Sequence, residues 1–90
     1  MTFKIERIAS ANRLTIKLSG QLDADCIAEL EAQIALGEGR IEFEMKEVTL
    51  VDGDVVRFLV RCEARGIYLR GCSAYISEWI RRERDSGIDE

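Results

Sequence analysis

The segment that decides the fold is residues 48–59, VTLVDGDVVRFL. It opens as a mainly apolar run typical of a β-strand and closes as a helix, in which Val55, Phe58 and Leu59 recur at helical spacing. Between the two parts lie residues 52–54, Asp-Gly-Asp, which we call the acidic junction. A strand that passes directly into a helix indicates an α/β unit. Two carboxylates at that point can serve as helix caps, metal ligands, phosphate acceptors or a recognition surface.

Before the acidic junction, the sequence predicts a hairpin and a helix. Residues 3–6 and 14–19 alternate apolar and polar side chains, which is the period of half-buried strands. The turn-rich residues 10–12 between them indicate an antiparallel hairpin. Asp23 is a favourable N-cap for the helix that follows it, and this helix ends near Gly37.

The rest of the chain supplies two more strands and two more helices. Residues 41–45 alternate strictly and predict a third strand, and a helix follows the acidic junction. Residues 67–70 predict a fourth strand, and Ser73 is placed to cap a last helix. We therefore expect one domain over residues 1–84, in the order β-β-α-β-α-β-α, followed by a polar tail over residues 85–90.

The alternation within the strands predicts an α/β fold with all three helices on one side of a mixed four-stranded sheet. Strands joined through helices imply parallel pairs with right-handed crossovers. Parallel strands covered on both faces read as continuous apolar runs, whereas these strands alternate. We therefore expect the other face to be open and ionic, carrying Lys4, Glu6, Thr15, Lys17, Glu42, Glu44, Tyr68 and Arg70. This open face is either solvated or a binding surface, and Tyr68 is the residue that favours binding.

Composition indicates a globular protein and disfavours two kinds of partner. The 90 residues are 47% hydrophobic and 33% charged, which suits a single core. The formal charge of −4 disfavours nucleic acid, because phosphate binding needs a clustered basic surface. No apolar run approaches the roughly 20 residues of a membrane span, and residues 1–4 do not begin a signal peptide. We expect a cytoplasmic protein with no membrane or nucleic-acid partner.

The cysteine and histidine content argues against a metal site and against an enzyme. Cys26, Cys62 and Cys72 are odd in number and form no Cys-x-x-Cys pair, so we expect three reduced thiols. The chain has no histidine, and a zinc site would therefore lack ligands. The usual general base of nucleophilic catalysis is missing for the same reason. We predict a non-catalytic protein without a cofactor.

At the acidic junction, several interpretations of the carboxylates stay open. One carboxylate can cap the second helix while the other lies in its first turn, and Gly53 lets the chain turn. A phosphate-binding loop is disfavoured, because the two carboxylates of the junction occupy the helix N-terminus where backbone N–H groups would bind a phosphate. A magnesium site would need another acid and a lysine, and the nearby candidates are Glu44 and Lys46. Glu44 should point to the open face, which disfavours this site. The remaining interpretation is a surface presented to another protein at the carboxyl edge of the sheet.

Four segments together resemble the STAS domains of anti-sigma factor antagonists and sulfate-transporter tails. They are residues 20–23 (GQLD), 48–52 (VTLVD), 65–69 (RGIYL) and 71–73 (GCS), and the resemblance spans residues 3–83 in order. It implies the same fold and a regulatory role through protein–protein contacts. In that family the second motif usually continues Asp-Ser-Ser-Gly or Asp-Thr-Ser-Gly. A partner kinase that doubles as an anti-sigma factor phosphorylates the second hydroxyl residue, which breaks binding, and a phosphatase restores it.

This chain departs from the family pattern at the phosphorylated position. Asp52 matches the aspartate of the motif, Gly53 its first hydroxyl residue and Asp54 the phosphorylated one. Val55 stands in place of the glycine, and Glu44 stands where an aspartate is common. Asp54 has no hydroxyl, which excludes serine phosphorylation, and its permanent charge is about half that of a phosphoserine. The domain is therefore either fixed in a phosphorylated-like state or binds a different partner constitutively.

Three arginines on the second helix add a flank to this region. Arg57, Arg61 and Arg65 recur at i, i+4 and i+8. They form either a solvated flank or a basic ridge for a partner. In the second case Arg57 also balances Asp54, three residues before it.

The sequence therefore predicts a STAS-like, non-catalytic interaction module of bacterial type. Its partner is expected to be an anti-sigma-factor-like kinase or another signalling protein, and its partner-binding residues to be Asp23, Asp52, Gly53, Asp54, Arg57 and Arg61. The alternative is a small-ligand or nucleotide-binding domain that uses the carboxyl edge of the sheet. A convergent apolar cavity beside Gly20 and Gly53 would favour the alternative, and a flat or convex acidic surface favours docking.

Overall fold

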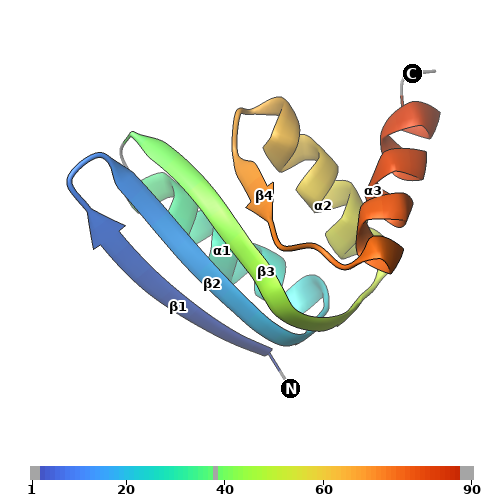
Figure 1. Ribbon diagram of the computed structural model, residues 1–90, viewed down its shortest axis with the longest axis horizontal. Helices are drawn as coiled ribbons and strands as arrows, with labels where there is room; N and C mark the ends of the chain where they lie inside the picture. Colours follow the sequence, from blue (N-terminus) through green and yellow to red (C-terminus); the bar gives the residue numbers. More distant parts are fainter. Residues whose placement is uncertain (1–2, 38, 88–90) are drawn as a thin grey trace.

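Four strands and three helices follow one another in the order predicted from the sequence (Figure 1). The structure is a computed structural model that describes residues 3–37 and 39–87. The strands are β1 (Phe3–Ser10), β2 (Arg13–Leu22), β3 (Arg40–Val51) and β4 (Tyr68–Arg70), and the helices are α1 (Ala24–Leu36), α2 (Gly53–Ala64) and α3 (Ala74–Gly87). Residues 85–87 of the predicted tail belong to α3, and residues 88–90 lie outside the described residues.

The sheet is mixed, as predicted, with the strand order β1-β2-β3-β4. β1 and β2 form the antiparallel hairpin, while β2–β3 and β3–β4 are parallel pairs. β3 is longer than the alternating residues 41–45, because it continues beside β2 as far as the pair Leu22–Val51. The register between β2 and β3 shifts twice, after Lys17 and after Gly20. Such shifts break strict alternation, so the second half of β3 does not show the period of a strand.

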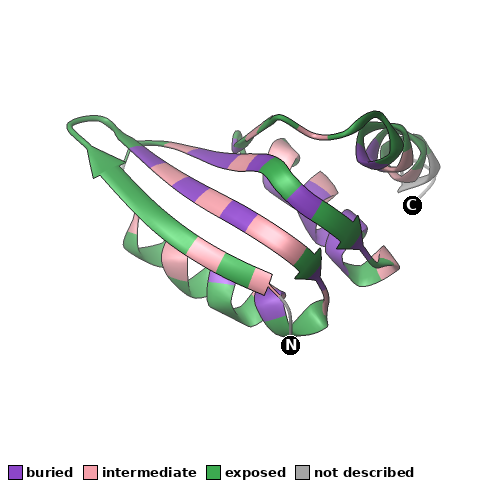
Figure 2. Ribbon diagram, turned by 60° about the horizontal axis from the view of Figure 1, so that its bottom comes forward, coloured by how far each residue is buried: buried purple, intermediate pink, exposed green. Residues whose placement is uncertain are grey.

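The helices lie on one side of the sheet, as the alternation predicted. α1 and α2 lie behind the sheet in Figure 1, and α3 packs on α2 beyond the short strand β4. Figure 2 shows buried and half-buried residues alternating along β2. The core between sheet and helices includes Leu14, Ile16, Leu18, Leu30, Phe43, Met45, Val55, Phe58, Leu59 and Ile76. Each such side chain contributes about 1.5–3 kcal/mol when fully buried.

The face of the sheet opposite the helices is not covered by any helix of the described residues. No helix in the same part of the chain combines the length and apolar character needed to span a membrane.

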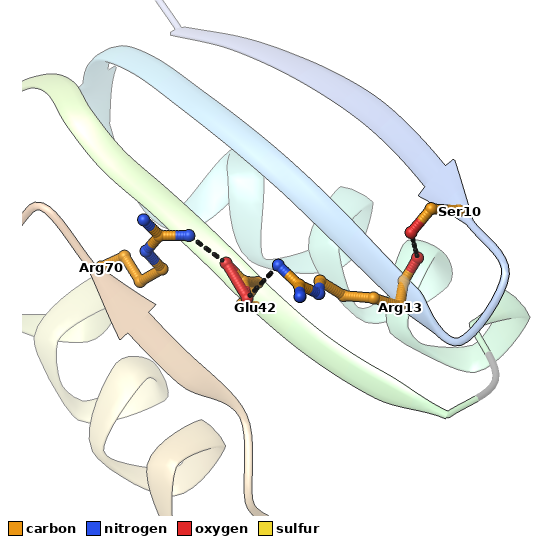
Figure 3. A network of polar contacts seen from close by, with 4 residues as sticks. All are labelled: Ser10, Arg13, Glu42 and Arg70. Carbon is orange, nitrogen blue, oxygen red and sulfur yellow. Dashed lines mark hydrogen bonds and ion pairs between the residues drawn. The ribbon is translucent and has the colours of Figure 1, made fainter.

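One prediction about the open face is wrong, because Glu42 is buried. Glu42 is only 4% exposed, whereas the other seven residues expected on the open face are exposed or half-buried. β3 is an interior strand, and Glu42 lies between Thr15 of β2 and Tyr68 of β4 in the register. Two arginines reach it from either side: Arg70 Nη1 donates to Glu42 Oε1 at 2.9 Å, and Arg13 Nη1 lies 3.4 Å from Oε2 (Figure 3). Alternation indicates the face on which Glu42 lies, but not that its neighbours cover it.

Candidate functional site

The residue after each of β2 and β3 is an aspartate that caps a helix. Asp23 Oδ1 accepts a hydrogen bond from the backbone N–H of Asp25 at 3.0 Å, and Asp52 Oδ1 accepts one from that of Val55 at 2.9 Å. Both aspartates have the extended backbone of N-cap residues. Each cap satisfies an N–H that the first helical turn leaves unpaired and stabilises the fold by about 0.5–2 kcal/mol. Both capping predictions are confirmed.

Parallel pairing places the two caps at the same edge of the sheet. Leu22 and Val51 are partners in the β2–β3 register, and a capping aspartate directly follows each of them. Figure 1 shows both strands ending at one edge, where α1 and α2 begin. The first turn of each helix carries one more aspartate. We call the resulting group the acidic edge; it consists of Asp23, Asp25, Asp52 and Asp54.

Asp54 presents its charge to solvent. Its side chain is 62% exposed, and Oδ1 accepts a hydrogen bond from Arg57 Nη2 at 2.7 Å. Arg57 Nη1 also lies 3.9 Å from Glu83 Oε2 on α3. Exposed ion pairs contribute only about 0.2–1 kcal/mol, so Arg57 orients Asp54 without burying it. The predicted pairing of these two residues is confirmed.

Gly53 does not provide the turn into α2. It is the first residue of that helix, and the described residues with a positive φ are four other glycines. A Cβ at position 53 would lie 3.4 Å from Arg57 Nη1, which is an ordinary contact with a flexible side chain. The prediction that glycine lets the chain turn here is therefore wrong, and the extended backbone of the Asp52 cap makes the turn.

Two arginines of α2 pair with different neighbouring helices. Arg57 reaches Glu83 on α3, while Arg65 Nη1 lies 3.5 Å from Glu31 Oε1 on α1. Arg61 is exposed and forms no ion pair with the part of the chain that the structure describes. Of the predicted partner-binding residues, Asp23, Asp52, Gly53, Asp54 and Arg57 lie together at the edge, and Arg61 lies one turn further along α2.

The thiol nearest the acidic edge is not a nucleophile at neutral pH. Burial, together with the carboxylates of Asp23 and Asp52, raises the pKa of Cys26 to about 11. A thiol with this pKa stays protonated near pH 7. The other two cysteines are also free, and burial raises the pKa of Cys62 to about 12 and raises that of Cys72.

The magnesium interpretation has no geometric support in the described residues. Within residues 3–37 and 39–87, no three acidic, cysteine or histidine side chains converge as a metal-binding group. Glu44, the acid considered as a third ligand, is the register partner of Lys17 and Arg70 on the open face, as predicted. It therefore does not join the acidic edge.

Several surface recesses lie away from the acidic edge. Four of those lined by described residues include neither an aspartate of the acidic edge nor Gly53. Two of these four, of about 620 and 450 Å³, share Arg70 and lie on the open face of the sheet.

Sequence reasoning missed a second group of polar residues, around the buried Glu42. Neither Arg13 nor Arg40 was singled out, although both fall at strand ends on the open face. The signal available in the sequence was a carboxylate within an alternating strand, with one arginine two residues before it on the same strand and another at the start of the neighbouring strand β2. Register decides whether such residues meet, and register is set by the whole sheet.

No protein-family model matches this chain, and a search of curated proteins finds no match. The resemblance to STAS domains therefore stays a prediction that rests on the four quoted segments. The order of strands and helices agrees with it, but fold alone does not determine function.

Proposed function

We propose that this protein is a non-catalytic, STAS-like regulatory module that binds a signalling protein through its acidic edge and needs no phosphorylation to do so. The observation that carries the proposal is the register pair Leu22–Val51, which sets two capped helix starts side by side. Four carboxylates then lie along one edge of the sheet, two at the ends of paired strands and two in the first turns of the helices that follow.

The chemistry of the acidic edge favours a partner with a basic surface. Fixed charges on rigid elements accelerate the association of oppositely charged surfaces and select against wrong partners. Arg57, beside Asp54, adds a guanidinium that can donate to a carboxylate or a carbonyl of the partner. An anti-sigma-factor-like kinase or another signalling protein is the partner that the STAS resemblance suggests.

Independence from phosphorylation follows from the residue at position 54. Asp54 is exposed in the first turn of α2, where the family pattern has the phosphorylated hydroxyl residue. A carboxylate has no hydroxyl to receive a phosphate as serine does, and its negative charge is permanent at neutral pH. We therefore expect constitutive binding to a partner that tolerates or requires this charge.

We place the module in the cytoplasm of a bacterial-type cell. The support is the presence of three free cysteines, which fit a reducing compartment. The three are Cys26, Cys62 and Cys72.

The direct test is an affinity measurement with the signalling proteins encoded beside the gene, the kinase-like ones first. Asp54→Asn removes one charge from the acidic edge, and Glu29→Gln removes one from an exposed position further along α1. We expect Asp54→Asn to weaken binding by about tenfold, the loss of one charge-assisted hydrogen bond, and Glu29→Gln to leave it unchanged. Equal affinities for the two variants would contradict the proposal.

A second test addresses phosphorylation. The protein is incubated with the kinase-like partner and ATP, and its intact mass is measured. The wild type should keep its mass, whereas Asp54→Ser, which restores the hydroxyl, should gain one phosphate group. A phosphate added to the acidic junction of the wild type would contradict the proposed independence from phosphorylation.

A further inference from the structure

Two arginines pair with one buried carboxylate on the open face of the sheet, and a third arginine lies on the same face. Arg13 of β2 and Arg70 of β4 approach Glu42 of β3 from opposite sides (Figure 3). Arg40, the first residue of β3, is the register partner of Arg13. Arg40 and Glu42 are two residues apart on one strand, so their side chains point to the same face.

The charges in this group do not balance. Glu42 pairs with Arg13 and Arg70, Glu44 is the register partner of Arg70, and Arg40 has no ion pair within the described residues, so three guanidinium groups lie near two carboxylates. Like charges at directly opposed positions on neighbouring strands are destabilising, and Arg13 and Arg40 are opposed in this way. Proteins keep such unfavourable pairs of like charges mainly at functional sites. The excess positive charge is notable in a protein whose formal charge is −4.

A recess of about 620 Å³ lies beside these arginines. It is lined by Arg40, Glu42, Gly66, Tyr68 and Arg70. Tyr68 is 64% exposed, so its ring is available to a ligand. Gly66 has φ +91°, and a Cβ there would meet no atom within 4 Å, so the recess is open on the side of this glycine. Its volume falls within the range of small-molecule sites, about 300–1,000 Å³.

We infer that this recess binds a small ligand that carries a phosphate or carboxylate group next to a planar ring. Arginine guanidinium groups match the geometry of both oxyanions and donate to them in pairs. An exposed tyrosine ring offers a face on which a planar group can stack. Glu42 acts as a positioning residue, because its two carboxylate oxygens hold Arg70 and Arg13 in place while Arg40 stays free to meet the anion.

This site is separate from the acidic edge. Arg40 begins β3 and the acidic junction follows its last residue, so the two sites lie at opposite ends of a strand of 12 residues. At about 3.3 Å per residue, they are roughly 35 Å apart along the strand. The inference therefore neither needs the proposed docking function nor supports it.

The test is a titration of the isotope-labelled protein followed by amide chemical shifts. The probes are adenosine 5′-monophosphate, which joins a phosphate to a ring, and benzoate, which joins a carboxylate to a ring. Adenosine and inorganic phosphate serve as the ring and the anion of the first probe, and benzyl alcohol and acetate as those of the second. We expect at least one joined probe to give saturable shifts around Tyr68 and Arg70, about tenfold tighter than either of its parts.

Two matched variants assign the binding to this recess. Arg40→Gln should weaken binding by about tenfold, whereas Arg7→Gln, which removes an exposed arginine from β1, should bind like the wild type. Tyr68→Ala should abolish the advantage of a joined probe over the anion alone, and it remains informative if Arg40→Gln does not fold. Circular dichroism checks that each variant is folded.

The outcomes separate clearly. Binding of the phosphate probe alone, the carboxylate probe alone or both identifies the source of the oxyanion and supports the site. No saturable shift with either joined probe would overturn the inference. Equal loss in Arg40→Gln and Arg7→Gln, or a joined probe that binds no tighter than its own anion alone, would overturn it as well.

Discussion

Replacing Glu42 by glutamine tests how much the buried carboxylate of β3 stabilises the fold. Glutamine has nearly the same shape and keeps one oxygen for Arg70, but it turns an amide group toward Arg13. Breaking a fully buried ion pair costs about 3–5 kcal/mol, because an unpaired charge stays buried. Here the remaining charges sit on Arg13 and Arg70, whose side chains are 49% and 51% exposed, and water can solvate them again.

The expected loss is therefore that of a charge-assisted hydrogen bond, about 2 kcal/mol at neutral pH. For a domain of this size, 2 kcal/mol corresponds to a fall in Tm of about 8–16 °C. Urea denaturation followed by circular dichroism measures the free energy of unfolding. Glu44→Gln is the matched control, because Glu44 lies on the same strand and face but is half-buried and receives no hydrogen bond within the described residues. We expect the control to change stability by less than about 0.5 kcal/mol.

The reasoning is refuted if Glu42→Gln is as stable as Glu44→Gln. Such a result would mean that the two arginines gain as much from water as from the carboxylate. It would also remove the positioning role that the ligand inference gives to Glu42.

Three further predictions concern the start of α2 and the buried thiols. Asp52→Ala should lower the free energy of unfolding by about 1 kcal/mol through loss of the cap to Val55, while Asp52→Asn, which keeps an acceptor, should cost less in the same urea titration. Gly53→Ala should raise stability by about 0.4–1 kcal/mol, since the backbone there is helical and the added methyl makes an ordinary contact; a destabilised variant would show that the position is crowded. The pKa of Cys26 is raised to about 11 and that of Cys62 to about 12, so the unfolded chain loses these protons first and stability should fall as pH rises from about 9 to 11. Cys26→Ala should reduce that slope, and an unchanged slope would contradict the assignment.

The order of elements followed from the sequence because each element carries a local signal. Alternation marks the strands, and capping residues mark where helices begin. Asp23 caps α1 as predicted, Asp52 is the one of the two junction aspartates that caps α2, and Ser73 Oγ accepts a hydrogen bond from the backbone N–H of Ile76 at 3.3 Å at the start of α3. Strict alternation also indicated that the helices cover a single face.

What the sequence did not show depends on contacts between distant residues. Arg65 pairs with Glu31 on α1 and Arg57 with Glu83 on α3, and neither pairing is visible in the spacing of the arginines. The burial of Glu42 depends on side chains from two neighbouring strands. Such contacts follow from register and helix placement, which no local pattern specifies.

At the candidate site, the individual aspartates were found but their grouping came from the sheet. Capping propensity indicated Asp23 and one aspartate of the acidic junction separately. The parallel pair Leu22–Val51 brings them to one edge. Gly53 was misread, because a glycine between two aspartates suggests a turn, whereas the backbone there is already helical.

The most direct test of the docking account is amide hydrogen exchange of the protein alone and in complex with its signalling partner. The account predicts that complex formation slows exchange at the first turns of α1 and α2, around residues 24–27 and 53–56, and leaves β1 unchanged. Slower exchange confined to the open face, with those two helix starts unaffected, would contradict it.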